Sequence, residues 1–157
     1  MPDKNFDDLA GHFQRKIYDG PKGQIRLAVL LRDLTEFEVI DQPPTTVLEA
    51  GGGLAFVGEQ FAFCGHRVTV CDISQTLLDS ARGRWRESGL STQGVFHNGR
   101  FQDLEERYQV VLCHAVLEWL EEPMAALEVL HQRTELGDHD RGRIRAATFE
   151  TWHRTAD

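Results

Sequence analysis

Three consecutive glycines behind a short apolar segment carry the clearest chemical signal in the sequence. The segment 45–50 contains Glu49 and leads into glycines at 51–53. A glycine-rich turn between a strand and a helix lets the backbone approach a ligand closely, next to unpaired N–H groups of the helix. The residues predict a nucleotide-type binding site there, with a tight structural turn as the alternative.

The glycine spacing also bears on which nucleotide would bind. The dinucleotide fingerprint G-x-G-x-x-G requires a third glycine at position 56, which is Phe56 here, so a nicotinamide or flavin cofactor is disfavoured. The order of an acidic residue and alternate glycines over 49–53 resembles motif I of S-adenosylmethionine-dependent methyltransferases. That cofactor has no pyrophosphate, and its site needs room for a ribose and a methionine chain.

Polar side chains follow the next two predicted strands. Asp72 comes directly after residues 67–71, where a carboxylate can accept hydrogen bonds from both ribose hydroxyls. Asp72 can equally cap the helix that follows it. Gln102 and Asp103 follow the third strand, where side chains can reach an adenine edge, and a solvated turn is the alternative reading.

The predicted elements that position these residues are strands and helices in alternation. Helices are predicted over 5–18, 23–40 and 54–64, from Ser74 to Gly89, and from Pro123 with Met124, Leu127 and Leu130; strands are predicted over 45–50, 67–71, 94–97 and 108–113. Such alternation predicts a parallel sheet with right-handed crossovers and helices on both faces, a doubly wound, Rossmann-like α/β fold.

Composition places the chain among ordinary soluble proteins. It has 157 residues and a net charge of −8, and no apolar run reaches the roughly 18 residues that span a bilayer. The first residues are acidic where a signal peptide would be basic and then apolar, so we expect a cytoplasmic protein. The three cysteines, Cys64, Cys71 and Cys113, form no C-x-x-C pair and are expected to be buried. The cluster of Arg15, Lys16, Lys22 and Arg26 is a phosphate contact or a solvated helix face.

Several stretches together resemble one enzyme family. The resemblance covers roughly residues 5–131 and rests on residues 5–10, 17–18, 22–26, 47–53, 65–66, 71–72, 102–103 and 114–119. The most specific of these are Lys-Gly-Gln-x-Arg at 22–26 and His-Ala-Val-Leu-Glu-Trp at 114–119. They resemble the bacterial tRNA 5-carboxymethoxyuridine methyltransferases, which implies a class I methyltransferase fold and S-adenosylmethionine as cofactor.

The resemblance also implies roles for individual residues. By it, Arg26 contacts the methionine carboxylate, and Gly51 and Gly52 line the cofactor. Asp72 would hold the ribose and His114 would lie near the methyl donor. The remaining pair, Phe101 and Gln102, would bracket the adenine.

The implied reaction transfers a methyl group to the carboxylate of 5-carboxymethoxyuridine at the tRNA wobble position. A carboxylate with a pKa of about 4 is ionised at neutral pH, so the reaction needs no general base. Positioning and exclusion of water would then be the catalytic contribution, and no catalytic residue or metal ligand is assigned. The rival reading is a non-catalytic fragment that binds S-adenosylmethionine.

Two departures from the family are visible. Ala55 stands where relatives keep a glycine, and we expect its methyl group beside the cofactor. The sequence after residue 130 looks unlike the family, so we expect a partial methyltransferase domain over 1–130 and a divergent, disordered tail over 131–157. Only four strands are then expected, and residues 110–113 would form an exposed edge prone to self-association.

Overall fold

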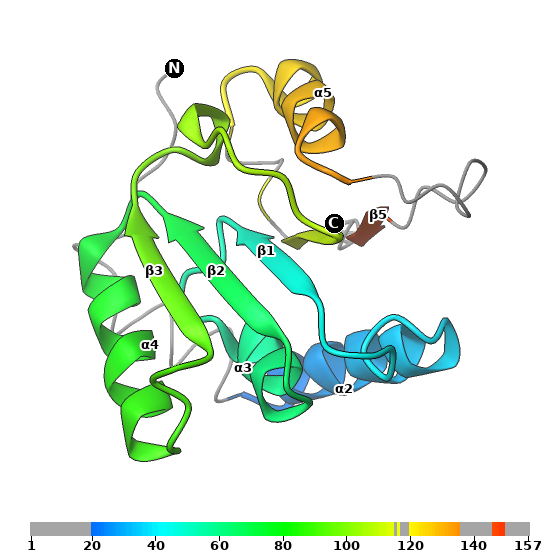
Figure 1. The fold of residues 1–157 in the computed structure, drawn as a ribbon, viewed down its shortest axis with the longest axis vertical. Helices are drawn as coiled ribbons and strands as arrows, with labels where there is room; N and C mark the ends of the chain where they lie inside the picture. Colours follow the sequence, from blue (N-terminus) through cyan, green and yellow to red (C-terminus); the bar gives the residue numbers. More distant parts are fainter. Residues whose placement is uncertain (1–19, 115, 117–119, 136–145, 150–157) are drawn as a thin grey trace, which may run out of the picture.

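The computed structural model describes residues 20–114, 116, 120–135 and 146–149, and it contains one sheet of five parallel strands in the order β3-β2-β1-β4-β5 (Figure 1). In chain order the elements are α2 (Pro21–Glu36), β1 (Thr46–Ala50), α3 (Phe56–Phe63), β2 (Arg67–Asp72), α4 (Gln75–Glu87), β3 (Gly94–Asn98), the short 3₁₀ helix η3 (Phe101–Asp103), β4 (Val110–His114), α5 (Pro123–Gln132) and β5 (Ala146–Phe149). The predicted doubly wound α/β class is confirmed.

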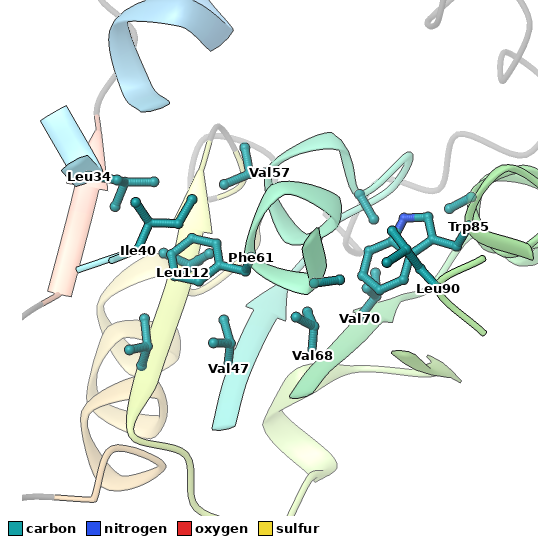
Figure 2. Close-up of a cluster of buried hydrophobic side chains, with 14 of the residues drawn as sticks. Leu34, Ile40, Val47, Val57, Phe61, Val68, Val70, Trp85, Leu90 and Leu112 are labelled. Carbon is teal, nitrogen blue, oxygen red and sulfur yellow. The ribbon is translucent and has the colours of Figure 1, made fainter. Parts of the chain in front are cut away.

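One face of the sheet packs against α2, α3 and α4. Alternate strand residues point to this face because side chains of a strand alternate in direction. Figure 2 shows the resulting apolar cluster, which runs from Leu34 and Ile40 past Phe61 of α3 to Trp85 of α4. Phe61 and Trp85 are fully buried, so this cluster holds α3 and α4 against the sheet.

The other face packs against η3 and α5. The intervening strand residues, among them Leu48, Cys71 and Cys113, form a second buried cluster with Phe101 and Leu130. Helices therefore cover both faces, and β4 is buried along Val110–Cys113 as its nearly continuous apolar sequence indicates. One side chain differs from prediction, because Cys64 is exposed, whereas the other two cysteines are buried as expected.

The ends of two helices follow the same hydrogen-bond pattern with different residues. At the end of α4, Gly89 has a φ of +74°, and the N–H of Leu90 donates to the carbonyl of Trp85 at 2.8 Å, a Schellman motif. At the end of α2 the left-handed residue is Glu38, with a φ of 55°. The glycine made the first end predictable, whereas α2 stops at Glu36 instead of continuing to residue 40 as predicted.

The sequence prediction of four strands is wrong, because β5 pairs with β4 in parallel. Its register joins Val111 to Ala146 and His114 to Phe149. Four residues of ordinary composition gave no alternating pattern to detect, and they form a strand because β4 offers a row of backbone donors and acceptors. β4 is therefore not the exposed edge that the expected self-association required.

Part of the expected tail is also folded. Helix α5 extends to Gln132, and Thr134 bridges to Tyr108, while residues 136–145 and 150–157 lie outside the described residues. The predicted helix over 5–18 lies outside them as well. Among the described helices, none is long and apolar enough to cross a membrane.

Candidate functional site

The carboxyl ends of the strands meet where the strand order reverses. The chain proceeds outward from β1 through β2 to β3, and then crosses to β4 on the opposite side of β1. In open α/β sheets, ligands lodge in the crevice at this switch point, beyond the carboxyl ends of the strands. The glycine loop (residues 51–55) follows β1 and therefore lies there.

The glycine loop is held by its neighbours on both sides. The N–H groups of Gly51 and Gly52 both donate to the carbonyl of Cys71, at 2.8 and 3.2 Å. A Cβ on Gly51, whose φ is +65°, would lie 2.6 Å from a methyl group of Val116, and one on Gly52 would lie 2.9 Å from Cγ of Glu49. Packing therefore requires glycine at both positions, and at Gly51 the left-handed backbone requires it as well.

Ala55, the last residue of the glycine loop, is buried in the core. It adopts a φ of 54°, which explains why a glycine suits this position, and it is only 1% exposed. Its methyl group belongs to the core cluster under α3. The expectation that this methyl group faces the cofactor is therefore wrong. Having alanine rather than glycine at this position adds a methyl group to the core instead.

Asp72 joins the ends of β1 and β2. Its Oδ2 atom accepts a hydrogen bond from the N–H of Gly53 at 2.9 Å, and Oδ1 accepts one from the N–H of Ser74 at 2.8 Å. Ser74 caps α4, because its Oγ accepts a hydrogen bond from the N–H of Leu77. Asp72 therefore does not cap this helix; its side chain closes the turn before the helix through the Ser74 N–H. A carboxylate has about four acceptor positions, which suits binding of ribose hydroxyls as well.

The turn that carries Phe101 and Gln102 lies beside the end of β2. The N–H of Gly99 donates to the carbonyl of Asp72 at 3.0 Å, and the Cys71 thiol donates to the carbonyl of Gly99 at 3.3 Å. Phe101 is 5% exposed and packs in the second core cluster, while Gln102 is half-buried. Of the two residues expected at the adenine, Gln102 is thus the more accessible.

Arg26 and His114 belong to distant parts of the chain but interact electrostatically in the fold. Both side chains are half-buried, Arg26 on α2 and His114 at the end of β4. Burial lowers the pKa of His114, and the positive charge of Arg26 lowers it further. His114 is therefore neutral near pH 7, and Arg26 supplies the positive charge at this end of the sheet.

Glu49 is a site residue that the sequence analysis did not assign. It is 6% exposed, and its Oε2 atom accepts a hydrogen bond from the N–H of Gly58 at 2.9 Å. Ala55 at the start of α3 has no side-chain oxygen, so Glu49 caps that helix from β1. Burial raises the pKa of Glu49 to about 8, against the Gly58 hydrogen bond and the charge of Arg84. An acidic residue ending a buried strand was the available signal.

The structure describes only part of the predicted N-terminal cluster of cationic residues. Lys22 is exposed on the first turn of α2, whereas Arg15 and Lys16 lie outside the described residues. Within the described part of the chain, no group of three or more acidic, histidine or cysteine side chains is arranged to hold a metal ion.

Comparisons with known proteins agree with this geometry. A family model described as "Methyltransferase domain" matches residues 47–136. The tRNA 5-carboxymethoxyuridine methyltransferase of Escherichia coli K12 is 38% identical over 135 residues, which are 83% of this chain and 52% of that protein; the protein of the same name from Escherichia coli O157:H7 gives the same values. The chain thus spans about half the length of the curated relatives it matches.

Solved structures support the fold. Magnesium protoporphyrin IX methyltransferase from Synechocystis PCC 6803 with bound SAM has a TM-score of 0.70 at 22% identity, over 83% of this chain and 68% of that one. A SAM-dependent methyltransferase from Thiobacillus denitrificans in complex with S-adenosyl-L-homocysteine has a TM-score of 0.66 at 22% identity, over 87% and 54%. The methyltransferase domain implies S-adenosylmethionine as the methyl donor, and the chain belongs to this methyltransferase family.

Proposed function

We propose that this chain uses S-adenosylmethionine to methylate the carboxylate of 5-carboxymethoxyuridine at the wobble position of tRNA. The hydrogen bond from the glycine loop at Gly53 to Asp72, at the carboxyl ends of β1 and β2 where the strand order reverses, carries the proposal. The 38% identity to the Escherichia coli enzyme supports the choice of substrate. The whole reaction is a proposal because the chain matches 52% of that relative.

The residues present fit this cofactor. Asp72 is a carboxylate at the end of β2, which suits the two ribose hydroxyls, and Gln102 offers an amide to the adenine edge. Phe101 would support the adenine from the core side. Arg26 offers a planar guanidinium, which binds a carboxylate through two parallel hydrogen bonds and so suits the methionine end.

The chemistry requires little from side chains. S-adenosylmethionine supplies a methyl group on a sulfonium, and a carboxylate oxygen of the substrate forms the new bond to carbon as the carbon–sulfur bond breaks, with both electrons going to sulfur. The substrate carboxylate is already ionised, so no proton has to move. Holding the reacting atoms in line at about 3 Å and excluding water then account for the rate.

His114 is suited to a positioning role in this step. Because it is neutral, it can donate or accept a hydrogen bond without adding a second positive charge beside Arg26. Lys22, exposed on α2, would approach the phosphates of tRNA.

Two measurements on the purified chain test the proposal. Thermal unfolding with S-adenosylmethionine, and with NAD as control, should show a rise for the first alone. At a hundred times its dissociation constant the ligand adds about 2.7 kcal/mol, a shift of roughly 5–10 °C. The chain is then incubated with labelled S-adenosylmethionine and tRNA carrying 5-carboxymethoxyuridine, with tRNA lacking the modification as control.

The outcomes distinguish cofactor binding from methylation of tRNA. Methylation of the modified tRNA alone supports the whole proposal. A thermal shift without methylation would identify a cofactor-binding chain that is not catalytic by itself, the rival reading of the sequence. An equal shift with NAD, or no shift, would contradict the cofactor site.

A further inference from the structure

Arg84 of α4 reaches across to the glycine loop and the start of α3. Its Nε donates to Oε2 of Glu59 at 2.8 Å, and another guanidinium nitrogen donates to the carbonyl of Leu54. The guanidinium carbon lies 4.1 Å from the centre of the Phe56 ring. These three contacts fall on the last part of the glycine loop and the first turn of α3.

The surroundings make these contacts stronger than an ordinary surface ion pair. The Arg84 side chain is 26% exposed and that of Glu59 is 9% exposed, so water screens the pair only partly. Glu59 also accepts a hydrogen bond from Ser88 at 3.4 Å, which ties it again to α4. A charged donor to a backbone carbonyl in such surroundings forms one of the stronger hydrogen bonds in proteins.

The loop needs an anchor of this kind. Gly51, Gly53 and Ala55 all have positive φ values, an irregular backbone that neither β1 nor α3 continues. The Leu54 carbonyl lies between the last two of these residues. Arg84 therefore fixes the loop at the point where its backbone passes into α3.

We infer that Arg84 is a positioning residue of the cofactor site: it holds the glycine loop through the Leu54 carbonyl and α3, without itself contacting the cofactor. The inference rests on the proposed function, because it assumes that the loop binds S-adenosylmethionine. It predicts that Arg84 affects cofactor affinity beyond its effect on stability.

Arg82 on the same helix provides a matched control. Its guanidinium donates to the carbonyl of Phe96 at 3.4 Å and lies 5.5 Å from the Phe96 ring centre. It thus makes the same two kinds of contact, to a carbonyl and to a phenylalanine ring, but on β3 rather than on the loop.

The experiment compares R84Q, R84K and R82Q with the unchanged chain. Thermal midpoints without ligand measure stability, and calorimetry measures the dissociation constant of S-adenosylmethionine. We expect R84Q to weaken binding at least tenfold and R82Q to leave it within twofold. In R84K, a lysine can still pair with Glu59 but lacks the second nitrogen for Leu54, so the midpoint should recover more than the affinity.

Amide hydrogen exchange in the ligand-free proteins gives a readout independent of binding. The N–H of Ala55 donates to the carbonyl of Gly52 at 2.9 Å within the loop. It should exchange faster in R84K and R84Q than in R82Q. If R84K binds as tightly as R82Q and Ala55 exchanges at the unchanged rate, the inference is overturned.

A failure of the proposed function would look different. If the unchanged chain does not bind S-adenosylmethionine, the cofactor assignment fails. Exchange at Ala55 then still decides the structural part of the inference: unchanged rates in both Arg84 variants would contradict it, and faster rates would support Arg84 as the anchor of the loop.

Discussion

The Oδ2 atom of Asp72 accepts a 2.9 Å hydrogen bond from the N–H of Gly53, which joins the end of β2 to the glycine loop after β1. One carboxylate is therefore both the expected partner of the ribose and a support of the loop. Asp72→Ala should lower the affinity for S-adenosylmethionine by about 1–3 kcal/mol, because the ribose hydroxyls lose a charged acceptor.

The same variant should lower the free energy of unfolding by a similar amount, about 1–3 kcal/mol, because the Gly53 and Ser74 N–H groups lose their acceptor. Calorimetric titration and urea denaturation separate the two effects. If Asp72→Ala loses stability but binds the cofactor with unchanged affinity, the ribose assignment is wrong and Asp72 is a support only.

Two glycines in helices should respond oppositely to alanine. A Cβ on Gly58 would lie 2.3 Å from Oε2 of Glu49, whereas one on Gly83 of α4 would meet nothing within 4 Å. Gly58→Ala should therefore destabilise the fold by about 1–3 kcal/mol through overpacking. Gly83→Ala should stabilise it by about 0.5–1 kcal/mol, because alanine loses less entropy on folding. Urea denaturation measures both, and equal changes would contradict the close contact with Glu49.

Glu49 should make stability depend on pH. Its pKa is raised from 4.5 to about 8 by burial, so between these values the folded chain keeps a proton that the unfolded chain has released. The free energy of unfolding should then fall as pH rises through this window, by at most about 1.4 kcal/mol per pH unit. Glu49→Gln keeps an oxygen for the Gly58 N–H and does not titrate.

The difference in the free energy of unfolding between Glu49→Gln and the unchanged chain isolates the contribution of the Glu49 carboxyl. His114 also titrates, but its contribution is common to both proteins. Urea denaturation at about pH 5 and pH 8 should show the variant gaining stability relative to the unchanged chain at the higher pH. Parallel pH profiles would show that Glu49 is ionised in the folded state throughout.

The cysteines should differ in reactivity. Cys64 is exposed, whereas burial raises the pKa of Cys71 and of Cys113 to about 12. Because the thiolate is the reactive form, an aromatic disulfide reagent should modify one thiol rapidly in the folded chain and all three after denaturation in urea. Cys64→Ser should abolish the rapid phase, and a rapid reaction that persists in this variant would show that the core around Cys71 or Cys113 opens.

Features that depend on neighbours in the sequence were predictable. The Ser74 cap and the Gly89 terminus of α4 are local signals, and both are confirmed by hydrogen bonds within a few residues. The end of α2 was missed because Glu38 takes the left-handed conformation that Gly89 takes in α4, and a glutamate gives no such signal. The burial of Leu34 and Val39 decides that turn.

The candidate site also has features that the sequence predicted and features that it did not. The glycine loop, Asp72 and the turn at Gln102 follow strands, so the sequence order alone placed them at one edge of a parallel sheet. The electrostatic effect of Arg26 on His114 depends on how α2 and β4 lie in the fold, and no spacing in the sequence encodes it. The resemblance to a known family, rather than periodicity, pointed to these two residues.

The sequence by itself determined the order and type of the main helices and strands from α2 to α5, the glycine loop and the family, because these follow from local periodicity, caps and contiguous motifs. Only the tertiary structure decided that Ala146–Phe149 pairs with β4, that Glu49 caps α3 and that Arg84 holds Leu54. Each of these contacts satisfies a backbone group with a partner from a distant segment. Such partners become adjacent only when the sheet and its helices pack together.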